Sequence, residues 1–453
     1  MRSGPRVRLR RGLALAGAGL LLRLLIAPSY GLGGVDADLI ELKQAVHIAL
    51  EQGFHEIYRA SARNDPALTG REWEGGYFTN QPPVIHYLRV ATGWVYRHVS
   101  PEGFALWPPE LNFLEAEKTD LHERLARSRG FTVALKLPGI VADALLTLGL
   151  FGFAAARAGE RLGLLVAGAY AFNPGIVFDT AYWGQHDAVA AGFLILGLCL
   201  VQGGRLEAGF SMAALGALSK PQTNAFWPLL LALGLLRFSL PRVAHAGLVT
   251  AGVVVLVFLP FLLGGTLWTS LDALFRSTFG GEPFVSCNAN NLWWLLSGGR
   301  GYEISDTAAL LGSLTPRVLG LAAFAGACVL AAWRLARRPD PDGTLGFLAA
   351  AVVGMSFFTL CTELHENHMM AVLPLLAFAL PGERHLWPVF ALLSVTFLLN
   401  MALFDTSVVE PWGRWLKAPV PVRALSLAVA AANTVGFLAL WRLYWVRTSD
   451  GPS

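Results

Sequence analysis

Long runs of apolar residues, separated by short polar segments, make up most of the chain. A helix needs about 20 apolar residues to cross the roughly 30 Å of hydrocarbon in a bilayer, and these runs reach or approach that length. They centre on residues 12–28, 132–156, 162–180, 187–203, 206–219, 222–238, 243–264, 314–335, 345–361, 368–380, 386–404 and 420–445. The pattern predicts an all-α, polytopic transmembrane helical bundle of about 12 to 13 spans, two of them short enough to be tilted or to be half-helices.

Two amphipathic segments lie between the first two runs. Residues 36–58 carry apolar side chains at helical spacing, which predicts a helix lying along the membrane surface. Residues 82–98 contain His86 and Arg89, which are costly at the bilayer centre, so we expect an interfacial or re-entrant helix. If that segment does not cross the membrane, the polar residues before and after it lie on the same side.

The charged residues fit this topology. They make up 15% of the chain against 54% hydrophobic residues, which excludes an ordinary soluble enzyme. Arginines gather between apolar runs, and because cytoplasmic loops are enriched in basic residues, they indicate the cytoplasmic face. They are Arg2, Arg6, Arg8, Arg10, Arg11, Arg237, Arg242, Arg334, Arg337, Arg338, Arg442 and Arg447. The net charge of +4 is thus a topology signal, and no nucleic-acid partner is expected.

The chain is predicted to form one integral-membrane domain over residues 1–453. A basic cytoplasmic tail (1–11) leads into an uncleaved first helix, because no clear small-x-small cleavage site follows it. Residues 29–130 are the first extracytoplasmic loop region, 131–280 the core spans and 281–453 the C-terminal spans. The four cysteines have no metal-ligand spacing, so neither a disulfide framework nor a zinc site is expected.

Five polar clusters are predicted on the extracytoplasmic face, namely the loop around Asp36, "YWGQHD", "SKPQ", "CNANNLWW" and "LHENHMM". The first contains Asp36, Asp38 and Glu41. Acidic residues at a helix N-terminus can simply cap the helix. A carboxylate in a partly desolvated cleft can instead take a proton from an alcohol, and a pair of carboxylates can bind a metal ion. An Asp-x-Asp pattern alone does not separate these interpretations.

Two polar segments, "NQPP" and "SKPQ", adjoin prolines that start helices. Pro82 fixes a helix start, so Asn80 and Tyr77 either precede a helix or line a cleft. In "SKPQTNAFWP", Lys220 is either a snorkelling lysine at a helix end or a cation for a phosphate, with Gln222 beside it.

The clusters at "YWGQHD" and "LHENHMM" carry more ionisable groups. The segment "FDTAYWGQHD" interrupts apolar sequence, and such groups at membrane depth usually face a cavity. Its polar and aromatic residues are Asp179, Trp183, Gln185, His186 and Asp187. The last of these can also cap the following helix.

In "TELHENHMM", His365 and His368 are three residues apart, which on a helix turns both rings the same way. Glu363 and Glu366 accompany them. The spacing differs from the metalloprotease H-E-x-x-H, so a zinc protease is not expected. The pair either stabilises a departing phosphate or is an ordinary interfacial cluster.

Taken in order, these motifs resemble the GT-C superfamily of integral-membrane glycosyltransferases. The resemblance covers about residues 10–400 and depends on the series "VDADLIELKQ", "NQPPVIHYL", "LKLPGIVADALL" with Lys136 and Asp143, "NPGIVFDTAYWGQHD", "SKPQTNAFWP", "VSCNANNLWWLL" and "LHENHMMAVLPLLAF". It points to two branches, the dolichyl-phosphate-glucose glucosyltransferases and the bacterial mannosyltransferase-like proteins related to enzymes of GPI assembly. The chain departs from the pattern at Asn80-Gln81 and at His368, which bears on the sugar used.

The resemblance implies transfer of a sugar such as mannose or glucose from a polyprenyl-phosphate donor to a lipid-linked or cell-envelope glycan, with inversion. Asp36 matches the catalytic position best and Asp38 is the second choice. Lys220, His365, His368 and Gln222 would bind the donor phosphate. Asn80, Trp183, Gln185, His186, Asp187 and Glu366 would bind sugar or acceptor. Some relatives use Mg²⁺ or Mn²⁺ and others no metal, and the expected location is a bacterial plasma membrane with an extracytoplasmic site.

A lipid-linked sugar flippase or secondary transporter is the main alternative, because it also uses charge within the membrane. It predicts inverted repeats and helices broken at mid-membrane, and the sequence indicates neither. A non-catalytic scaffold would leave the repeated polar clusters without a role.

Overall fold

The computed structural model of the chain describes residues 5–29, 35–63, 79–111, 116–278, 281–310, 312–338, 340 and 343–446. Within these ranges the regular structure is helical, and β pairing is limited to isolated bridges. The helices are α1 Pro5–Ile26, α2 Val35–Glu51, η1 Phe54–Glu56, α3 Ile57–Ala62, α5 Pro83–Val99, α6 Pro101–Ala105, α7 Lys118–Arg127, α8 Arg129–Ala158, α9 Glu160–Ala171, α10 Pro174–Val177, η2 Phe178–Trp183, α11 Asp187–Gln202, α12 Leu206–Ala217, η3 Pro221–Phe226, α13 Trp227–Arg237, α14 Leu240–Leu263, α15 Leu267–Thr278, α16 Leu292–Leu296, η4 Gly301–Glu303, α17 Pro316–Arg337, α18 Thr344–Leu360, α19 Val372–Ala379, η5 Leu380–Gly382, α20 Leu386–Ala402, α21 Thr406–Leu416 and α22 Val422–Val446. The all-α prediction is therefore confirmed for the described part of the chain.

The apolar runs in the sequence fall in helical segments, but a break after Ala171 divides the run 162–180, and the run 368–380 is helical only from Val372 onward. By length and composition, four helices can cross a membrane, namely α8, α14, α17 and α22, and the number rises to six if two bent pairs count as single spans. The helix α1 is outside this group because arginines stand near both of its ends. At 1.5 Å per residue, the 12 residues of α12 extend only about 18 Å, which is short of the bilayer core.

One of the two bent pairs breaks a predicted apolar run, 162–180, whereas the other bends where the predicted run 386–404 ends. The segment Glu160–Ala171 meets Pro174–Trp183 at 44°, and Leu386–Ala402 meets Thr406–Leu416 at 91°. At the first bend, the Asn173 side chain accepts hydrogen bonds from the backbone N–H groups of Gly175 and Ile176, so one helix ends and the next is capped there. Apolar periodicity runs through such a break, and the sequence pattern therefore did not reveal it.

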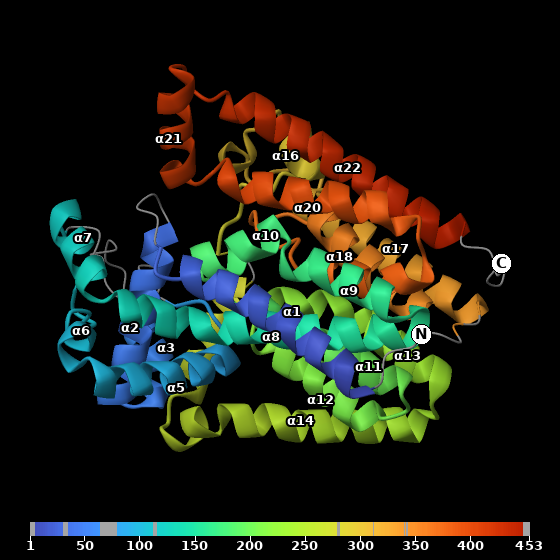
Figure 1. Cartoon of the computed structure of the whole chain (residues 1–453), viewed down its shortest axis with the longest axis horizontal. Helices are drawn as coiled ribbons and strands as arrows, with labels where there is room; N and C mark the ends of the chain where they lie inside the picture. The colour runs from blue at the N-terminus through green and yellow to red at the C-terminus, as the bar shows by residue number, and fades with distance from the viewer. Residues whose placement is uncertain are drawn as a thin grey trace.

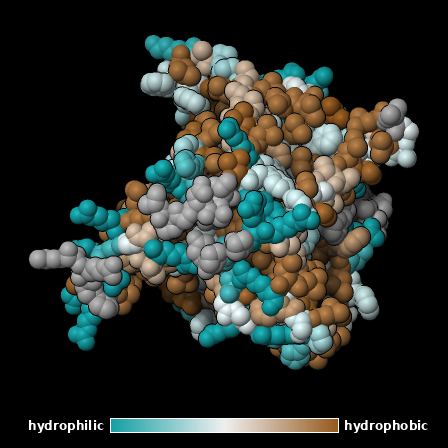
Figure 2. Space-filling model, turned by 90° about the vertical axis from the view of Figure 1, so that its right-hand side faces the viewer, coloured by the Kyte–Doolittle hydropathy of each residue, from teal (hydrophilic) through white to brown (hydrophobic). Residues whose placement is uncertain are grey.

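The bundle has two different ends (Figure 1). We call the end with α2, α3, α5, α6 and α7 the loop-rich end, and the end where α1 begins and α22 finishes the termini end. At the termini end, Arg11 pairs with Glu160 at 2.6 Å and Arg242 with Glu207 at 3.1 Å. Figure 2 looks at this end and shows hydrophilic residues across it, with extensive hydrophobic surface beside them. Arg11 and Arg242, two of the arginines that the charge pattern assigns to the cytoplasmic face, thus lie at this end.

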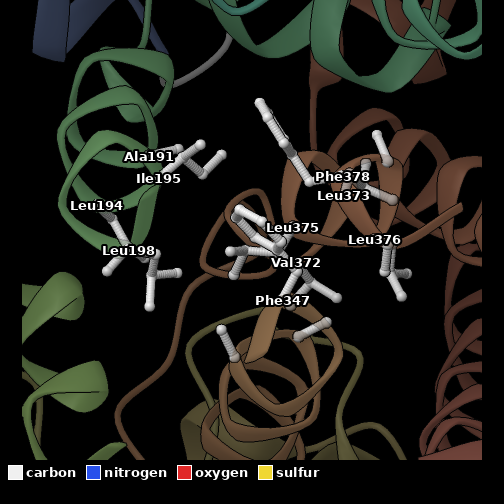
Figure 3. Close-up of a cluster of buried hydrophobic side chains, with 14 of the residues drawn as sticks. Ala191, Leu194, Ile195, Leu198, Phe347, Val372, Leu373, Leu375, Leu376 and Phe378 are labelled. Carbon is white, nitrogen blue, oxygen red and sulfur yellow. The ribbon is translucent and has the colours of Figure 1, made fainter. Parts of the chain in front are cut away.

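The core lies where α11, α18 and α19 meet. Leu194 and Leu198 of α11 approach Phe347 of α18 and Leu375 of α19, and Figure 3 shows these side chains facing one another. Both α18 and α19 are buried on all sides, which explains why they are apolar around their whole circumference. Helices that are more exposed, such as α14, surround them.

A buried ionic group joins three outer helices. Arg23 of α1 donates from Nε to Oδ2 of Asp143 on α8 at 2.8 Å, and the Tyr170 hydroxyl of α9 donates to Oδ1 at 2.6 Å. Arg23 and Asp143 are at most 1% exposed. A charge in such surroundings needs a partner, so the group fixes the packing of α1, α8 and α9.

The helix α5 belongs to the loop-rich end. It packs against α2 and the first turns of α8. Its Tyr96 stacks on Phe131 of α8, with ring centres 4.8 Å apart. Its first turn meets the end of α12, because the Val84 N–H donates to the Leu218 carbonyl at 2.9 Å. It is not among the helices long and apolar enough to cross a membrane. Its interfacial position at the membrane stays a prediction.

Candidate functional site

Polar residues from five segments converge at the loop-rich end. They come from the start of α2, from α5, from the 182–187 segment before α11, from the 219–222 segment before η3 and from the loop 361–371. We call this group the central cluster and define it as Asp38, Arg89, Gln185, His186, Asp187, Lys220, Gln222, His365, Asn367 and His368.

Asp38 stands in the first turns of α2 and joins this cluster through Gln185, whose Nε2 donates to Asp38 Oδ2 at 3.0 Å. Surrounding protein atoms raise the pKa of the Asp38 carboxyl above its ordinary value. The bond from Gln185 and the charges of His365, Lys220 and Arg89 counter this rise only in part. A carboxylate with a raised pKa, set beside cations, suits proton acceptance from a hydroxyl.

Asp36 lies in the first turn of α2, but its side chain is outside the described part of the structure. Tyr77 is also outside the described residues. The choice between Asp36 and Asp38 as catalytic residue therefore stays a prediction.

The segment that carries Gln185 is held by Lys136 of α8. The Lys136 ammonium donates to the carbonyls of Ser29, Ala181 and Tyr182 at 2.8, 2.9 and 2.7 Å. Gly184 then turns the chain with φ of 79°, and a β-carbon at this glycine would lie 2.7 Å from Lys136 Cγ. The π-helix η2 and this turn direct the side chains from Gln185 onward toward α2 and α5.

Arg89 is a member of this cluster that the sequence interpretation did not assign to the site. It is 1% exposed, donates to the Gln81 side chain, and its Nη2 lies 3.3 Å from Nδ1 of His186. Its Nε has no partner among the described residues. Burial lowers the pKa of Arg89 to about 9 against the charges of Asp38 and Asp187, so it stays positive at neutral pH. The signal for it was a charged residue on an otherwise apolar face of an amphipathic segment.

Lys220 is buried and forms an ion pair with Asp187, which also accepts from Asn367 Nδ2 at 3.3 Å. The two paired side chains are 9% and 8% exposed. Lys220 therefore does not snorkel to the surface. Asp187 is the first residue of α11, but His186 holds the cap position and no side chain caps this helix, so the capping interpretation is wrong. The Asp187 carboxylate instead accepts from Lys220 and Asn367.

The histidine pair lies in the loop 361–371, which is not helical as its spacing had suggested. The rings of His365 and His368 are nevertheless close, with centres 5.3 Å apart, and the His365 N–H donates to Nδ1 of His368 at 3.2 Å. Nε2 of His368 is 2.6 Å from Nε2 of Gln222. Backbone turns, and not a helix face, bring the pair together.

A small pocket opens beside Lys220 and His368. Its water-accessible space of about 20 Å³ holds about one water molecule. Polar walls from Asp187 and Gln222 face apolar walls that include Phe226 and Phe357 of the core. The Lys220 ammonium thus borders directly on the apolar interior.

Three predicted residues are less closely joined to this cluster. Trp183 is 4% exposed and donates to Asp405 Oδ2 at 2.8 Å, so its ring belongs to the core and is not free to stack on a sugar. Asn80 is exposed, and no hydrogen bond in the described part of the structure joins it to the cluster. Glu366 is half-buried, with Oε2 3.9 Å from Nδ1 of His365, and burial raises the pKa of its carboxyl.

One group of side chains has the arrangement of a metal site. Among the described residues, Glu282, Cys287 and His365 form the group whose possible ligand atoms all lie within 4.8 Å of one another. The described acidic residues at Asp38 form no such group.

Comparison of the chain with models of known protein families and with curated proteins gives no match. The resemblance to GT-C glycosyltransferases consequently depends on the ordered sequence motifs alone.

Proposed function

We propose that the protein is a GT-C-type membrane glycosyltransferase. It transfers a sugar, such as mannose or glucose, from a polyprenyl-phosphate donor to a lipid-linked or cell-envelope glycan at the extracytoplasmic face. The observation that carries the proposal is the position of one carboxylate, Asp38, opposite two buried cations, Arg89 and Lys220, at one end of an apolar helical bundle. A donor with a lipid tail and an anionic headgroup needs an apolar surface for the tail and cations for the headgroup.

The residues fit a direct displacement. An aspartate of the Asp36/Asp38 pair takes the proton of an acceptor hydroxyl, and the hydroxyl oxygen forms a bond to the anomeric carbon. The bond from that carbon to the phosphate oxygen breaks, and the polyprenyl phosphate leaves with the bonding electron pair. Because a phosphate is already a good leaving group, positioning and charge stabilisation are the main requirements.

Arg89 and Lys220 are the candidates to stabilise that phosphate. Arg89 has an unpartnered Nε among the described residues and no carboxylate within ion-pair distance there, so no ion pair neutralises its charge. Lys220 already pairs with Asp187, which makes it a positioned but partly neutralised cation. A guanidinium also offers the planar set of donors that suits a phosphate.

The test is transfer by the purified full-length protein in detergent or lipid. Radiolabelled polyprenyl-phosphate mannose, glucose and arabinose are supplied with a glycolipid extract as acceptor. We expect labelled product with one of these donors, and a loss of about 10² to 10⁴ in rate for the Asp36→Asn or Asp38→Asn variant that lacks the base. Asp272→Asn on α15, which alters an exposed pair with Arg276, is the matched control. Wild-type rates in both α2 variants would overturn the base assignment.

A lipid-linked sugar flippase or transporter is the second candidate, and the bends in α9–η2 and α20–α21 favour it because transporters use broken helices. The two candidates separate in sealed vesicles. A transporter moves the donor across the bilayer without breaking the sugar–phosphate bond, whereas a transferase releases polyprenyl phosphate.

A further inference from the structure

Glu282, Cys287 and His365 bring three different ligand types together beside the central cluster. Their carboxylate, thiol and imidazole atoms lie within 4.8 Å of one another, and Nε2 of His365 is 3.5 Å from Oε2 of Glu282. Cys287 is buried, whereas the other two side chains are 44% and 37% exposed. An ion can therefore reach the buried sulfur from the open side of the group.

Backbone pairing holds these residues in place. The N–H of Cys287 donates to the Leu364 carbonyl at 2.9 Å, and the N–H of Glu363 donates to the Phe284 carbonyl at 3.1 Å. Arg317 of α17 also donates a hydrogen bond to the Glu363 side chain. The two loops that supply the three side chains are thus fixed to each other without a metal.

Polar groups beside these three residues have an arrangement that is common around bound metal ions. Nδ1 of His365 faces Oε2 of Glu366 at 3.9 Å, and the Tyr302 hydroxyl donates to Oε2 of Glu282 at 3.0 Å. Histidine ligands commonly direct their second ring nitrogen at a carboxylate, and ligating carboxylates commonly accept a further hydrogen bond. That Glu366 oxygen accepts no hydrogen bond from the described residues, so it is available to orient the ring.

We propose that Glu282, Cys287 and His365 bind a divalent cation of the zinc class. Thiolate and imidazole ligands suit Zn²⁺, whereas Mg²⁺ and Mn²⁺ prefer sites built from oxygen. A tetrahedral zinc ion holds its ligand atoms roughly 3 to 4 Å apart, so a rotation of the exposed Glu282 closes the site. Binding transfers the thiol proton to solvent, and the three protein ligands leave a fourth position for water or a substrate oxygen.

This site differs from a metal held by Asp36 and Asp38, and it does not depend on sugar transfer. Because Asp38 lies within electrostatic range of His365, a cation here would sit at the edge of the central cluster. Metal binding is measured directly, so a failure of the proposed function would leave the result unaffected.

The experiment uses the full-length protein, purified without a histidine tag and stripped with a chelator. Titration with Co²⁺ should produce a thiolate-to-metal charge-transfer absorption, and Zn²⁺ should displace it at one ion per chain by elemental analysis. Zn²⁺ should also protect Cys287 from maleimide in peptide mass spectrometry. Tyr302→Phe, which removes only the outer hydrogen bond, should weaken binding about 10- to 100-fold.

Two cysteine variants decide the assignment. Cys287→Ser should lose the charge-transfer absorption, whereas Cys199→Ser on α11 should keep it together with the wild-type affinity. If Cys287→Ser does not fold, the protection of Cys287 in the wild type decides instead. The proposal is overturned if the stripped protein takes up no metal, if Cys287→Ser binds with the same spectrum, or if Zn²⁺ leaves Cys287 fully reactive.

Discussion

The ion pair between Lys220 and Asp187 can be tested as both a structural and a functional element. Both side chains are less than 10% exposed. For two unit charges in contact at about 3 to 4 Å, an effective dielectric of about 20 gives an attraction of roughly 4 to 6 kcal/mol. Desolvation of each ion offsets that attraction, so the pair adds little net stability, but removing one partner leaves a buried, uncompensated charge.

Lys220→Met and Asp187→Asn should therefore each destabilise the protein by about 3 to 5 kcal/mol. The double variant should be within about 1 kcal/mol of the wild type, because neither charge remains and Asn367 can still bond to the amide at 187. The measurement is unfolding in lipid–detergent micelles, followed by tryptophan fluorescence and evaluated as a double-mutant cycle. Asp272→Asn should change stability by 1 kcal/mol or less, since its pair with Arg276 is about half exposed.

Activity separates the two roles of Lys220. If the lysine contacts the donor phosphate, the stable double variant should still lose affinity for the donor by about tenfold or more. Two results would refute the reasoning. One is a single variant as stable as the wild type, because a buried charge cannot lose its partner without cost. The other is a double variant less stable than either single variant.

Three further predictions follow from other contacts. Gln185→Met removes a hydrogen bond that lowers the pKa of Asp38, and the pKa of Asp38 should therefore rise. The acidic limb of the kcat/KM profile should then move to higher pH. An unmoved limb would exclude Asp38 as the base. Gly139→Ala places a β-carbon 2.8 Å from the Gln185 carbonyl and should reduce transfer. Gly152→Ala on the same helix, with open space around it, should leave the rate unchanged in the same assay. Arg23→Met leaves the buried Asp143 carboxylate without its cation, with the Tyr170 hydroxyl still bonded to it, and should cost about 3 to 5 kcal/mol in the micelle unfolding measurement.

The sequence predicted the helices well because apolar periodicity is a local property. Nearly every apolar run became one helix, and the polar segments between them supply most of the central cluster, while Asp38 and Arg89 lie on the helices α2 and α5. The bend at Asn173 was not predicted, since its cause is a local side-chain cap within otherwise apolar sequence. The non-helical loop around His365 was not predicted either, because backbone pairing with the distant residue Cys287 competes with helix formation there.

The candidate site was predicted in part for the same reason. Gln185, Asp187 and Lys220 stand out in apolar surroundings, and the structure joins Gln185 to Asp38 and Lys220 to Asp187. Arg89 gave a weaker signal because an amphipathic helix can carry a charge on its solvated face. The group of Glu282, Cys287 and His365 gave none, since its last two members are far apart in sequence and no spacing rule joins them.

The protonation states divide the roles within the central cluster. Burial, followed by the charges of Arg89 and Lys220, lowers the pKa of His186 well below its ordinary value. Burial, followed by His365 and Lys220, does the same for His368. These two rings are therefore neutral at neutral pH and act as hydrogen-bonding groups. In the proposed reaction, Arg89 and Lys220 are therefore our candidates for the positive charge that stabilises a departing phosphate. This links the proposed chemistry to α5, whose arginine the sequence pattern alone treated as a cost.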